Sequence, residues 1–471
     1  MPEPASAACR PAAPLRVSRS NPRYFETPDG RAVYLAGSHT WSNAQDASGD
    51  GDRPEPFDNR GFLSLLAAGG NTVTRLWRLE GSRTGRGRWV EPQAWLRTGP
   101  GLALDCRPRF DLTRVDPAYM ARLRARVQAA SAQGIHSIVM LFNGWSHERH
   151  DAGDPWPWHP FHAANNVNGV DGDPEGQENG RMLASLRLPD ALAVQEAFVR
   201  HCVEGLRDLD GVLWEVANEV RLTPDSVAWT RHMVRLLRRL QAGMPHPRPI
   251  GATAPYPEQL PAAAMRAFTA ESGADWVSPH GWYDGWQDDP PEAGGRQVVL
   301  LDSDHTFGIG GDAVWVWKGF ARGHNLLVMD SLAGRPDLAG RMTPHPEHAE
   351  VEESARRGLH GTRDAAVRLN LARAVPAGAL CSTGYCLARP GRQYLAFAPE
   401  GGRLTLDLSA AAGRRLAAHW LEVDRYDGRL VPAGLVEGGG ARTLDPPFAG
   451  PAALLLEHPR DARRPPPCGR A

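Results

Sequence analysis

The fold is constrained most by an alternation of two patterns between residues 32 and 373. Short apolar runs, typical of buried strands, alternate with longer segments in which apolar residues recur at helical spacing. The apolar runs cover residues 32–37, 72–77, 136–142, 212–216, 249–254, 276–279, 298–301 and 325–329. Because strands that alternate with helices form parallel sheets, these eight runs in order predict an α/β fold, the TIM (β/α)₈ barrel.

The segments between these runs carry helix signals. Helices are expected at 57–68, 118–132, 189–209, 224–242, 258–269, 312–322 and 350–373. Asp116 and Pro117 supply an N-cap and a first-turn proline for the second of these helices. The crossover around residues 286–295 has only a weak helical pattern, so we expect a short connection before the seventh strand.

The pattern of this chain of 471 residues changes after residue 373. Short alternating runs then occur at 379–386, 393–398, 403–408, 416–423 and 452–457. Separated by Gly, Pro and Asp, they predict a small antiparallel β-sandwich. We therefore expect a barrel over residues 21–373 and a sandwich over residues 374–460. The barrel would carry long loops at 80–115 and 143–188, with a flexible segment at 1–20 and a disordered tail at 461–471.

Composition excludes several kinds of partner. The formal net charge is −1 and no cluster of Lys and Arg occurs, so we expect no nucleic-acid partner. No apolar run reaches the ~18 residues of a membrane span, and the first residues lack the apolar stretch of a secretory signal. These observations predict a cytoplasmic protein without a membrane partner, or a secreted one if the natural chain begins upstream. Nothing in the sequence indicates an oligomeric state.

Polar side chains follow the predicted strands at the end where a (β/α)₈ barrel carries its active site. The run VLWEVANEV ends in Asn218 and Glu219, and the seventh strand leads into Asp302 and Asp304. Cleavage of a glycosidic bond requires two carboxyl groups, one to protonate the leaving oxygen and one to attack or to position water. We therefore expect Glu219, Asp302 and Asp304 to be catalytic.

The other strand ends offer residues that could hold a sugar. An arginine beside a carboxylate keeps it ionised, and tryptophan rings stack on the apolar faces of sugars. The candidates are His39, Trp41, Arg75, Trp77, Trp145, Asn218, His280, Trp282, Tyr283 and His305. They predict a carbohydrate substrate and no cofactor.

Several longer phrases resemble a known family. NPRYFETPDGRAVYLAGSHTWSNAQD, FDLTRVDPAYMARLRARV, HPFHAANNVNG, WEVANE, LLDSDHTFG and WVWKGFARGHN are similar to clan A glycoside hydrolases of the cellulase type, a group of (β/α)₈ retaining enzymes. The C-terminal unit resembles the β-sandwich often appended to such barrels. The resemblance implies Glu219 as acid/base, Asn218 as a hydrogen-bond partner of a sugar hydroxyl, and His280 as a lining residue. It also implies that Arg75 and Tyr283 hold the nucleophile.

The sequence departs from this family at the nucleophile. The clan normally carries Glu at the end of strand seven, where this chain has Asp302 and then Asp304. Aligned by strand length, Asp302 matches best, and Asp304 would point to the same side if the strand continued. A separation of ~5–5.5 Å between the two carboxyl groups is typical of retention, and ~6.5–9.5 Å of inversion. Retention, inversion and loss of hydrolysis therefore all stay open.

Two other functions are also open. His39, His280, Asp302, Asp304 and His305 are residue types that a metal-dependent TIM-barrel hydrolase uses, but no HxH or HExxH pattern is present. A barrel that had lost catalysis would keep the tryptophans and bind carbohydrate. The Asn- and Asp-rich stretch at 165–178 could bind calcium through oxygen ligands, but it departs from the EF-hand pattern and Asx turns explain it equally well. We expect no metal.

Overall fold

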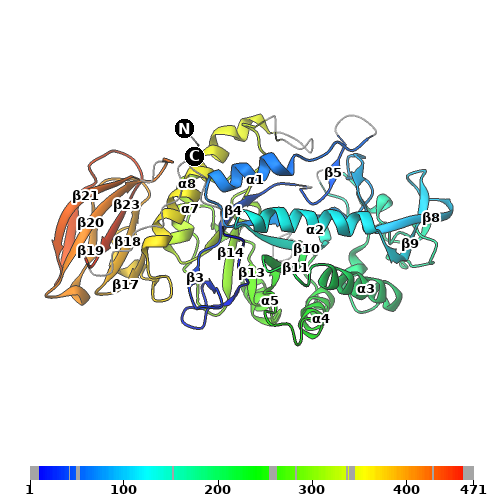
Figure 1. Ribbon diagram of the computed structural model, residues 1–471, viewed down its shortest axis with the longest axis horizontal. Helices are drawn as coiled ribbons and strands as arrows, with labels where there is room; N and C mark the ends of the chain where they lie inside the picture. Colours follow the sequence, from blue (N-terminus) through cyan, green and yellow to red (C-terminus); the bar gives the residue numbers. More distant parts are fainter. Residues whose placement is uncertain are drawn as a thin grey trace, which may run out of the picture.

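A computed structural model of the protein describes residues 10–459, apart from 42, 49–52, 151–152, 254–261, 282–283, 336–337, 339–344 and 427–428. Its centre is a parallel barrel, with a β-sandwich packed on one side and a long hairpin projecting on the other (Figure 1). None of the described helices is long and apolar enough to cross a membrane.

The described residues form a closed barrel of eight strands. The strands are β4 (Ala36–His39), β6 (Val73–Leu76), β10 (His136–Asn143), β11 (Val212–Asn218), β12 (Ile250–Thr253), β13 (Trp276–Ser278), β14 (Val298–Asp302) and β15 (Asn325–Met329). Neighbours in the chain pair in parallel, and β15 pairs with β4. The ring closes between β4 and β6, where Thr40 bridges Leu76 and the Thr72 amide donates to the Ala36 carbonyl at 2.8 Å. The predicted (β/α)₈ barrel is confirmed.

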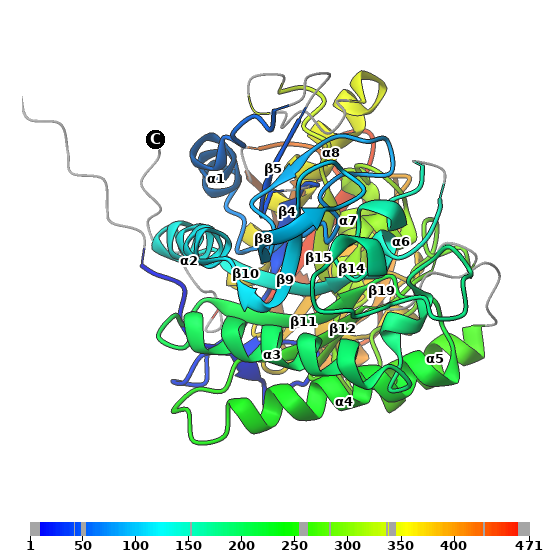
Figure 2. The same cartoon turned by 90° about the vertical axis from the view of Figure 1, so that its right-hand side faces the viewer.

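Helices cover the outside of the barrel (Figure 2). They are α1 (Asn59–Ala68), α2 (Pro117–Ala132), α3 (Pro189–Gly205), α4 (Pro224–Leu240), α5 (Ala262–Glu271), α7 (Ala313–Ala321) and α8 (Ala349–Arg368). The four-residue helix α6 (Ser303–Thr306) instead follows β14 directly, at the mouth of the barrel. Asp116 caps α2 by accepting from the Ala118 amide, as its position before Pro117 predicted. No α-helix lies in the described residues between β13 and β14, in agreement with the weak pattern there.

The end of the barrel at which the strands begin is covered by a small antiparallel sheet. It consists of β1 (Arg16–Val17), β2 (Phe25–Glu26) and β3 (Ala32–Val33). Leu15 and Phe25 are buried there against the first residues of several barrel strands. The first predicted strand, 32–37, was therefore wrong in its extent, because residues 32–33 pair with β2 and the barrel strand begins at Ala36.

Part of the N-terminal segment that we expected to be flexible is packed in this sheet. Residues 10–20 are described and include β1, whereas residues 1–9 lie outside the described residues. The expected tail at 461–471 also lies outside them.

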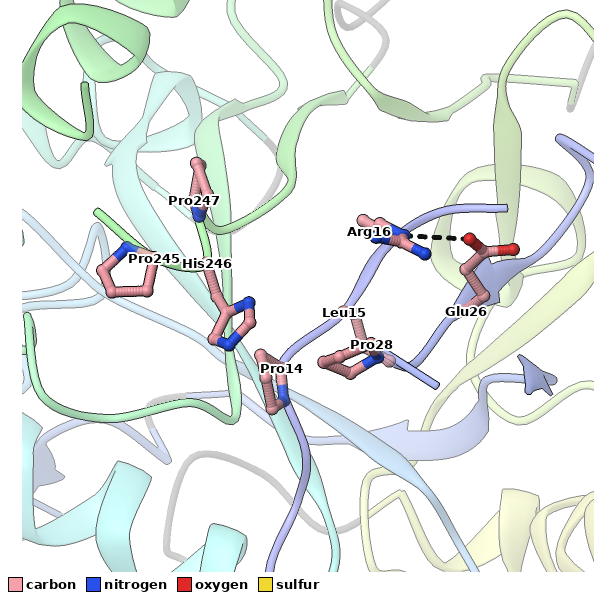
Figure 3. Close-up of a pocket in the computed structure, with 8 residues that line it drawn as sticks. All are labelled: Pro14, Leu15, Arg16, Glu26, Pro28, Pro245, His246 and Pro247. Atoms are coloured by element: carbon pink, nitrogen blue, oxygen red, sulfur yellow. Dashed lines mark hydrogen bonds and ion pairs between the residues drawn. The ribbon is translucent and has the colours of Figure 1, made fainter. Parts of the chain in front are cut away.

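A small hollow lies beside this covering sheet (Figure 3). It is lined by Pro14, Leu15, Arg16, Glu26, Pro28, Pro245, His246 and Pro247. Arg16 Nε donates to Glu26 Oε1 at 2.9 Å, so the two charges of the hollow satisfy each other. Because these residues precede the barrel strands, the hollow is at the opposite end from the candidate acids.

The two long loops contain secondary structure of their own. The first carries β7 (Val90–Glu91), which pairs with β5 (Asp46–Ala47), and the projecting hairpin of β8 (Trp95–Leu102) and β9 (Pro108–Val115). The described part of the second carries four short 3₁₀ helices: η1 (Gly144–Ser146), η2 (Trp156–Trp158), η3 (Ala163–Asn165) and η4 (Arg181–Ala184). Both loops follow the ends of barrel strands, so they build the wall of the mouth.

The C-terminal residues form the expected β-sandwich. One sheet contains β16 (Val375–Pro376), β17 (Cys386–Arg389), β18 (Gln393–Ala398), β23 (Ala452–Glu457), β20 (Arg415–Glu422) and β21 (Leu430–Glu437). The other contains β19 (Leu404–Asp407) and β22 (Ala441–Leu444), and the short helices η6 (Pro346–His348), η7 (Gly378–Leu380) and η8 (Ser409–Ala411) lie in the connections.

Alternation along β18 explains how the sandwich joins the barrel. Tyr394 and Ala396 face the core between the two sheets, whereas Leu395 and Phe397 pack with Trp317 of α7. Side chains of a strand point alternately to opposite faces, so an apolar strand can serve both cores. The sheet is therefore buried on both faces.

Candidate active site

Arg75 lies at the centre of a buried network of charges at the mouth of the barrel. Its Nε and Nη2 atoms donate to the two carboxylate oxygens of Glu215 at 2.8 and 2.5 Å. Nη2 also donates to Asn218 Oδ1 at 2.7 Å, and Nη1 to Asp302 Oδ2 at 3.3 Å. Burial alone would lower the pKa of Arg75, but Glu215 and Asp302 raise it. The guanidinium therefore stays charged and holds three strand ends together.

Glu215 is a site residue that the sequence analysis missed. It lies on β11, is fully buried, and accepts from Thr253 as well as from Arg75. The available signal was a lone acidic residue inside an apolar strand, two positions after the interior residue Leu213. Period two places both side chains on the interior face of the barrel.

Asp302 is a buried anion with partners on every side. It ends β14 and caps α6, where its Oδ1 accepts from the Asp304 amide at 3.1 Å. His39 Nε2 lies 3.1 Å from the same oxygen, and only 1% of the Asp302 side chain is exposed. Burial alone would raise the pKa of Asp302, but His39, His305 and Arg75 bring it well below its usual range.

Asp304 lies at the mouth, but not on a continuation of strand β14, as the sequence analysis considered. The strand does not continue past Asp302, because the chain turns into α6 at Ser303. Asp304 therefore stands on the first turn of a helix. Its side chain is 21% exposed, unlike that of Asp302.

Glu219 and Asp304 face each other. A carboxylate oxygen of one lies within 4.8 Å of a carboxylate oxygen of the other, and Glu219 is 11% exposed. Burial, followed by the charge of Asp304, raises the pKa of Glu219 to about 8. Burial and the charge of Asp302 raise the pKa of Asp304 to about 6. Between these values Asp304 is ionised while Glu219 keeps its proton, a division of roles typical of acid/base pairs.

The backbone at Glu219 is strained. Its φ is 45°, in the left-handed region that a residue with a Cβ atom rarely adopts. The loop after β10 passes so close that a Cβ atom on Gly144 would lie 2.4 Å from the Glu219 carbonyl oxygen. Glycine at 144 is therefore required for the loop to press against this turn.

Asn218 positions Glu219 and is itself held by three side-chain hydrogen bonds. Its Nδ2 donates to Glu219 Oε2 at 3.1 Å and to Asn143 Oδ1 at 3.2 Å, while its Oδ1 accepts from Arg75. None of its surface is exposed. With both amide hydrogens engaged and the side chain buried, only the second lone pair of Oδ1 remains for the sugar hydroxyl that the resemblance led us to expect there. Asn143, which the sequence analysis did not select, orients Asn218.

The predicted aromatic residues divide into two groups. Trp77 is buried and forms an edge-to-face contact with the half-buried Trp145, at 6.1 Å between ring centroids. Trp41 is also half-buried and packs against the same apolar cluster. Trp282 and Tyr283 lie outside the described residues. Trp41 and Trp145 are only half-buried near the mouth, and the ring of His150 already stacks on that of Trp145 at 3.5 Å between centroids.

Two of the predicted histidines stack on each other. The rings of His280 and His305 lie 5.5 Å apart with an angle of 28° between their planes. Burial lowers the pKa of His280 to about 4 and that of His305 well below its usual range. Both rings are therefore neutral at physiological pH.

Within the described residues, three clusters have side chains of metal-ligating type. In the cluster of Glu80, His147 and His159, His159 Nδ1 accepts from the Phe161 amide at 3.1 Å. Nε2 must then carry the proton of the neutral ring, so it cannot bind a metal. The cluster of His345, Glu347 and His348 precedes α8, where the helix dipole opposes a cation.

The third cluster consists of Glu219, Asp304 and His305. It coincides with the facing acids. Of the five residues considered for a metal-dependent hydrolase, Asp304 and His305 belong to this cluster, whereas His39 and Asp302 pair with each other. The residues considered as metal ligands from the sequence are therefore divided between the cluster of Glu219, Asp304 and His305 and the pair of His39 and Asp302.

Solved structures of glycoside hydrolases share this fold. One described as a glycoside hydrolase superposes with a TM-score of 0.60 at 13% identity, over 95% of this chain and 97% of the other. A glycoside hydrolase family 5 protein from Bacteroides vulgatus ATCC 8482 gives a TM-score of 0.59 at 12% identity, over 94% and 93%. No family model and no curated protein matches the sequence. At these identities the likeness concerns the fold alone.

Proposed function

We propose that the protein is a glycoside hydrolase that cleaves an O-glycosidic bond in an oligo- or polysaccharide with retention of configuration. Glu219 is the acid/base and Asp304 the nucleophile. The observation that carries this proposal is the facing pair of partly buried carboxyl groups with opposite protonation states near neutral pH. The barrel shared with glycoside hydrolase structures supports it at the level of fold.

The reaction takes two displacements. In the first, an oxygen of Asp304 bonds to the anomeric carbon, the glycosidic C–O bond breaks, and the leaving oxygen takes the proton of Glu219. In the second, Glu219 removes a proton from water, the water oxygen bonds to the anomeric carbon, and the bond to Asp304 breaks. Both carboxyl groups return to their starting states.

The choice of Asp304 over Asp302 rests on access and separation. Asp302 is 1% exposed and bound by His39, Arg75 and the Asp304 amide, whereas Asp304 is 21% exposed. The approach of Asp304 and Glu219 to within 4.8 Å favours direct attack, since inverting enzymes use gaps of ~6.5–9.5 Å to admit water. Asp302 instead acts as a fixed charge that keeps Arg75 and His39 in place.

Azide rescue of alanine variants on an activated aryl glycoside tests both assignments. Glu219→Ala with azide should give a glycosyl azide of retained configuration, because the covalent intermediate still forms. Asp304→Ala with azide should give the inverted azide, because azide replaces the nucleophile. Asp302→Ala is the matched control and should show no rescue. An inverted azide from Asp302→Ala would move the nucleophile to that residue, and unchanged turnover of Glu219→Ala would refute the proposal.

A metal-dependent hydrolase is the second candidate. The cluster of Glu219, Asp304 and His305 favours it, because three ligand types lie within 4.8 Å of one another. Removal of metals with EDTA separates the two. A glycosidase of the proposed kind keeps its turnover after dialysis against EDTA, whereas a loss that Zn²⁺ or Mn²⁺ restores would favour the metal enzyme. A carbohydrate-binding barrel without catalysis would bind oligosaccharides in calorimetry and release no product.

A further inference from the structure

His305 presents one buried nitrogen to both proposed catalytic carboxyl groups. Its Nε2 lies 3.8 Å from Glu219 Oε1 and 3.9 Å from Asp304 Oδ2. This nitrogen has no hydrogen-bond partner, and the side chain is 0% exposed. A buried polar atom without a hydrogen-bond partner destabilises the fold. The position of this nitrogen between the two proposed catalytic groups therefore indicates a function.

The surroundings determine which nitrogen carries the proton. Ser278 Oγ lies 3.2 Å from Nδ1 of His305. A bare lone pair on Nε2 would face an ionised Asp304, which is unfavourable. The ring is therefore protonated at Nε2, and the Ser278 hydroxyl donates to Nδ1.

Neighbouring groups contact both the backbone and the ring of His305. His305 lies on α6, which begins at the cap residue Asp302. The Gly281 amide donates to the His305 carbonyl at 3.0 Å, and the ring of His280 stacks on that of His305. The backbone of His305 is therefore anchored, and Nε2 lies at nearly equal distances from the two carboxyl groups.

The charges around His305 come from several elements. Asp302 and Asp304 belong to the same turn, Glu219 follows β11, Arg75 lies on β6 and His39 on β4. His280 follows β13. Burial keeps the pKa of His305 well below its usual range, so the ring stays neutral while Asp304 and Glu219 titrate.

We propose that His305 is a positioning residue that donates its Nε2–H to whichever of the two carboxyl groups is ionised. The proposal rests on the proposed function and deepens it. Before the first displacement Asp304 is the anion and receives the hydrogen bond. After it, Asp304 is a neutral ester and Glu219 is the anion, so the donor tilts to Glu219. His305 itself exchanges no proton in either displacement.

Two amide variants test this role because each places its side-chain N–H donor at a different ring-nitrogen position. Gln at 305 puts its amide nitrogen near the position of Nε2, whereas Asn puts it near Nδ1. Asp304 and Glu219 are titrated by ¹³C NMR in protein labelled at side-chain carboxyl groups, a readout that needs no substrate. We expect His305→Asn to raise the pKa of Asp304 by roughly 0.5–1 unit, and His305→Gln to leave it within a few tenths.

Turnover provides the second readout. His305→Asn should lower kcat by roughly 10- to 100-fold with little change in KM, because the hydrogen bond is needed as charge moves. His305→Gln should recover most of this loss. Ser278→Ala, which frees the ring to change tautomer, should lie between them. His324→Asn replaces a buried histidine that is bound to the Pro291 carbonyl, and controls for loss of an imidazole.

The outcomes separate this proposal from the proposed function. If Glu219→Ala abolishes turnover while the two His305 variants behave alike in both readouts, the donor role is wrong and the glycosidase assignment stands. If no glycoside is turned over but His305→Asn shifts the Asp304 titration and His305→Gln does not, the donor role stands and the glycosidase assignment fails. Melting curves of His305→Asn and His305→Gln are compared with that of the wild type. If both variants unfold, they lose turnover equally, and this result counts against the donor role.

Discussion

Replacement of Asp304 by Asn should lower the pKa of Glu219. The facing oxygens lie within 4.8 Å of each other, and burial and the charge of Asp304 together bring the pKa of Glu219 to about 8. At this limiting separation of 4.8 Å, two unit charges interact by about 0.9 kcal/mol at the dielectric constant of water and about 3.5 kcal/mol at an effective value of about 20. One pKa unit corresponds to about 1.4 kcal/mol, so the expected fall is between about 0.6 and 2.5 units.

The assay is a titration of side-chain carboxyl groups by ¹³C NMR between pH 4 and pH 10. The resonance of Glu219 is identified by its absence in Glu219→Gln. The wild-type protein should titrate at this position near pH 8. Asp304→Asn should titrate lower but still above the ordinary value of 4.5, because burial, the larger cause of the shift, remains. Asp190→Asn, at an exposed position on the first turn of α3, is the control.

Two results would refute this reasoning. A Glu219 midpoint that is the same in Asp304→Asn and in the wild type would mean that the two carboxyl groups are not coupled. A wild-type midpoint near 4.5 would mean that the site is open to water. Either result would remove the electrostatic basis for assigning the proton to Glu219.

Three further outcomes follow from the same geometry. The plot of kcat/KM against pH should be bell-shaped with limbs near 6 and 8, because Asp304 must be ionised and Glu219 protonated; a single limb in stopped assays across pH 4–10 would contradict the pair. Because the folded pKa of Glu219 is raised, its contribution to stability is present below about pH 4.5 and lost as pH rises through 8. Glu219→Gln should therefore raise the melting temperature at pH 9 and leave it unchanged at pH 4; equal shifts at both would contradict the burial of this charge. Arg75→Met should lower the free energy of unfolding in urea by about 3–5 kcal/mol, since it leaves Glu215 and Asp302 buried without a partner, with Arg75→Lys as the milder control; a loss under 1 kcal/mol would mean that the network is hydrated.

Part of the site could be predicted from the sequence because strand ends mark it. Glu219, Asp302 and Asp304 were selected on the position of each acid after an apolar run, and all three lie at the barrel mouth. Glu215 was missed because a single acid inside a strand gives no sign of a partner 140 positions away in the chain. Asn143 was missed for the same reason, since its contact with Asn218 joins two different strands.

The hairpin of β8 and β9 was also not predicted. Its residues follow a buried strand and were expected to form a loop, because Gly, Pro and Arg interrupt the alternation there. A hairpin is stabilised by pairing between its two strands, which a reading of each segment alone does not detect.

The barrel, the sandwich and the edge of the barrel at which the acids gather were all predictable from the sequence. Period and composition encode these features locally, so they could be read from neighbouring residues. How the acids differ in exposure and pKa depends on the tertiary structure. Whether β14 continues to Asp304 or turns into α6 depends on the capping of that helix by Asp302, and this places Asp304 opposite Glu219. Protonation then depends on burial and on charges brought together from distant strands, which no local pattern records.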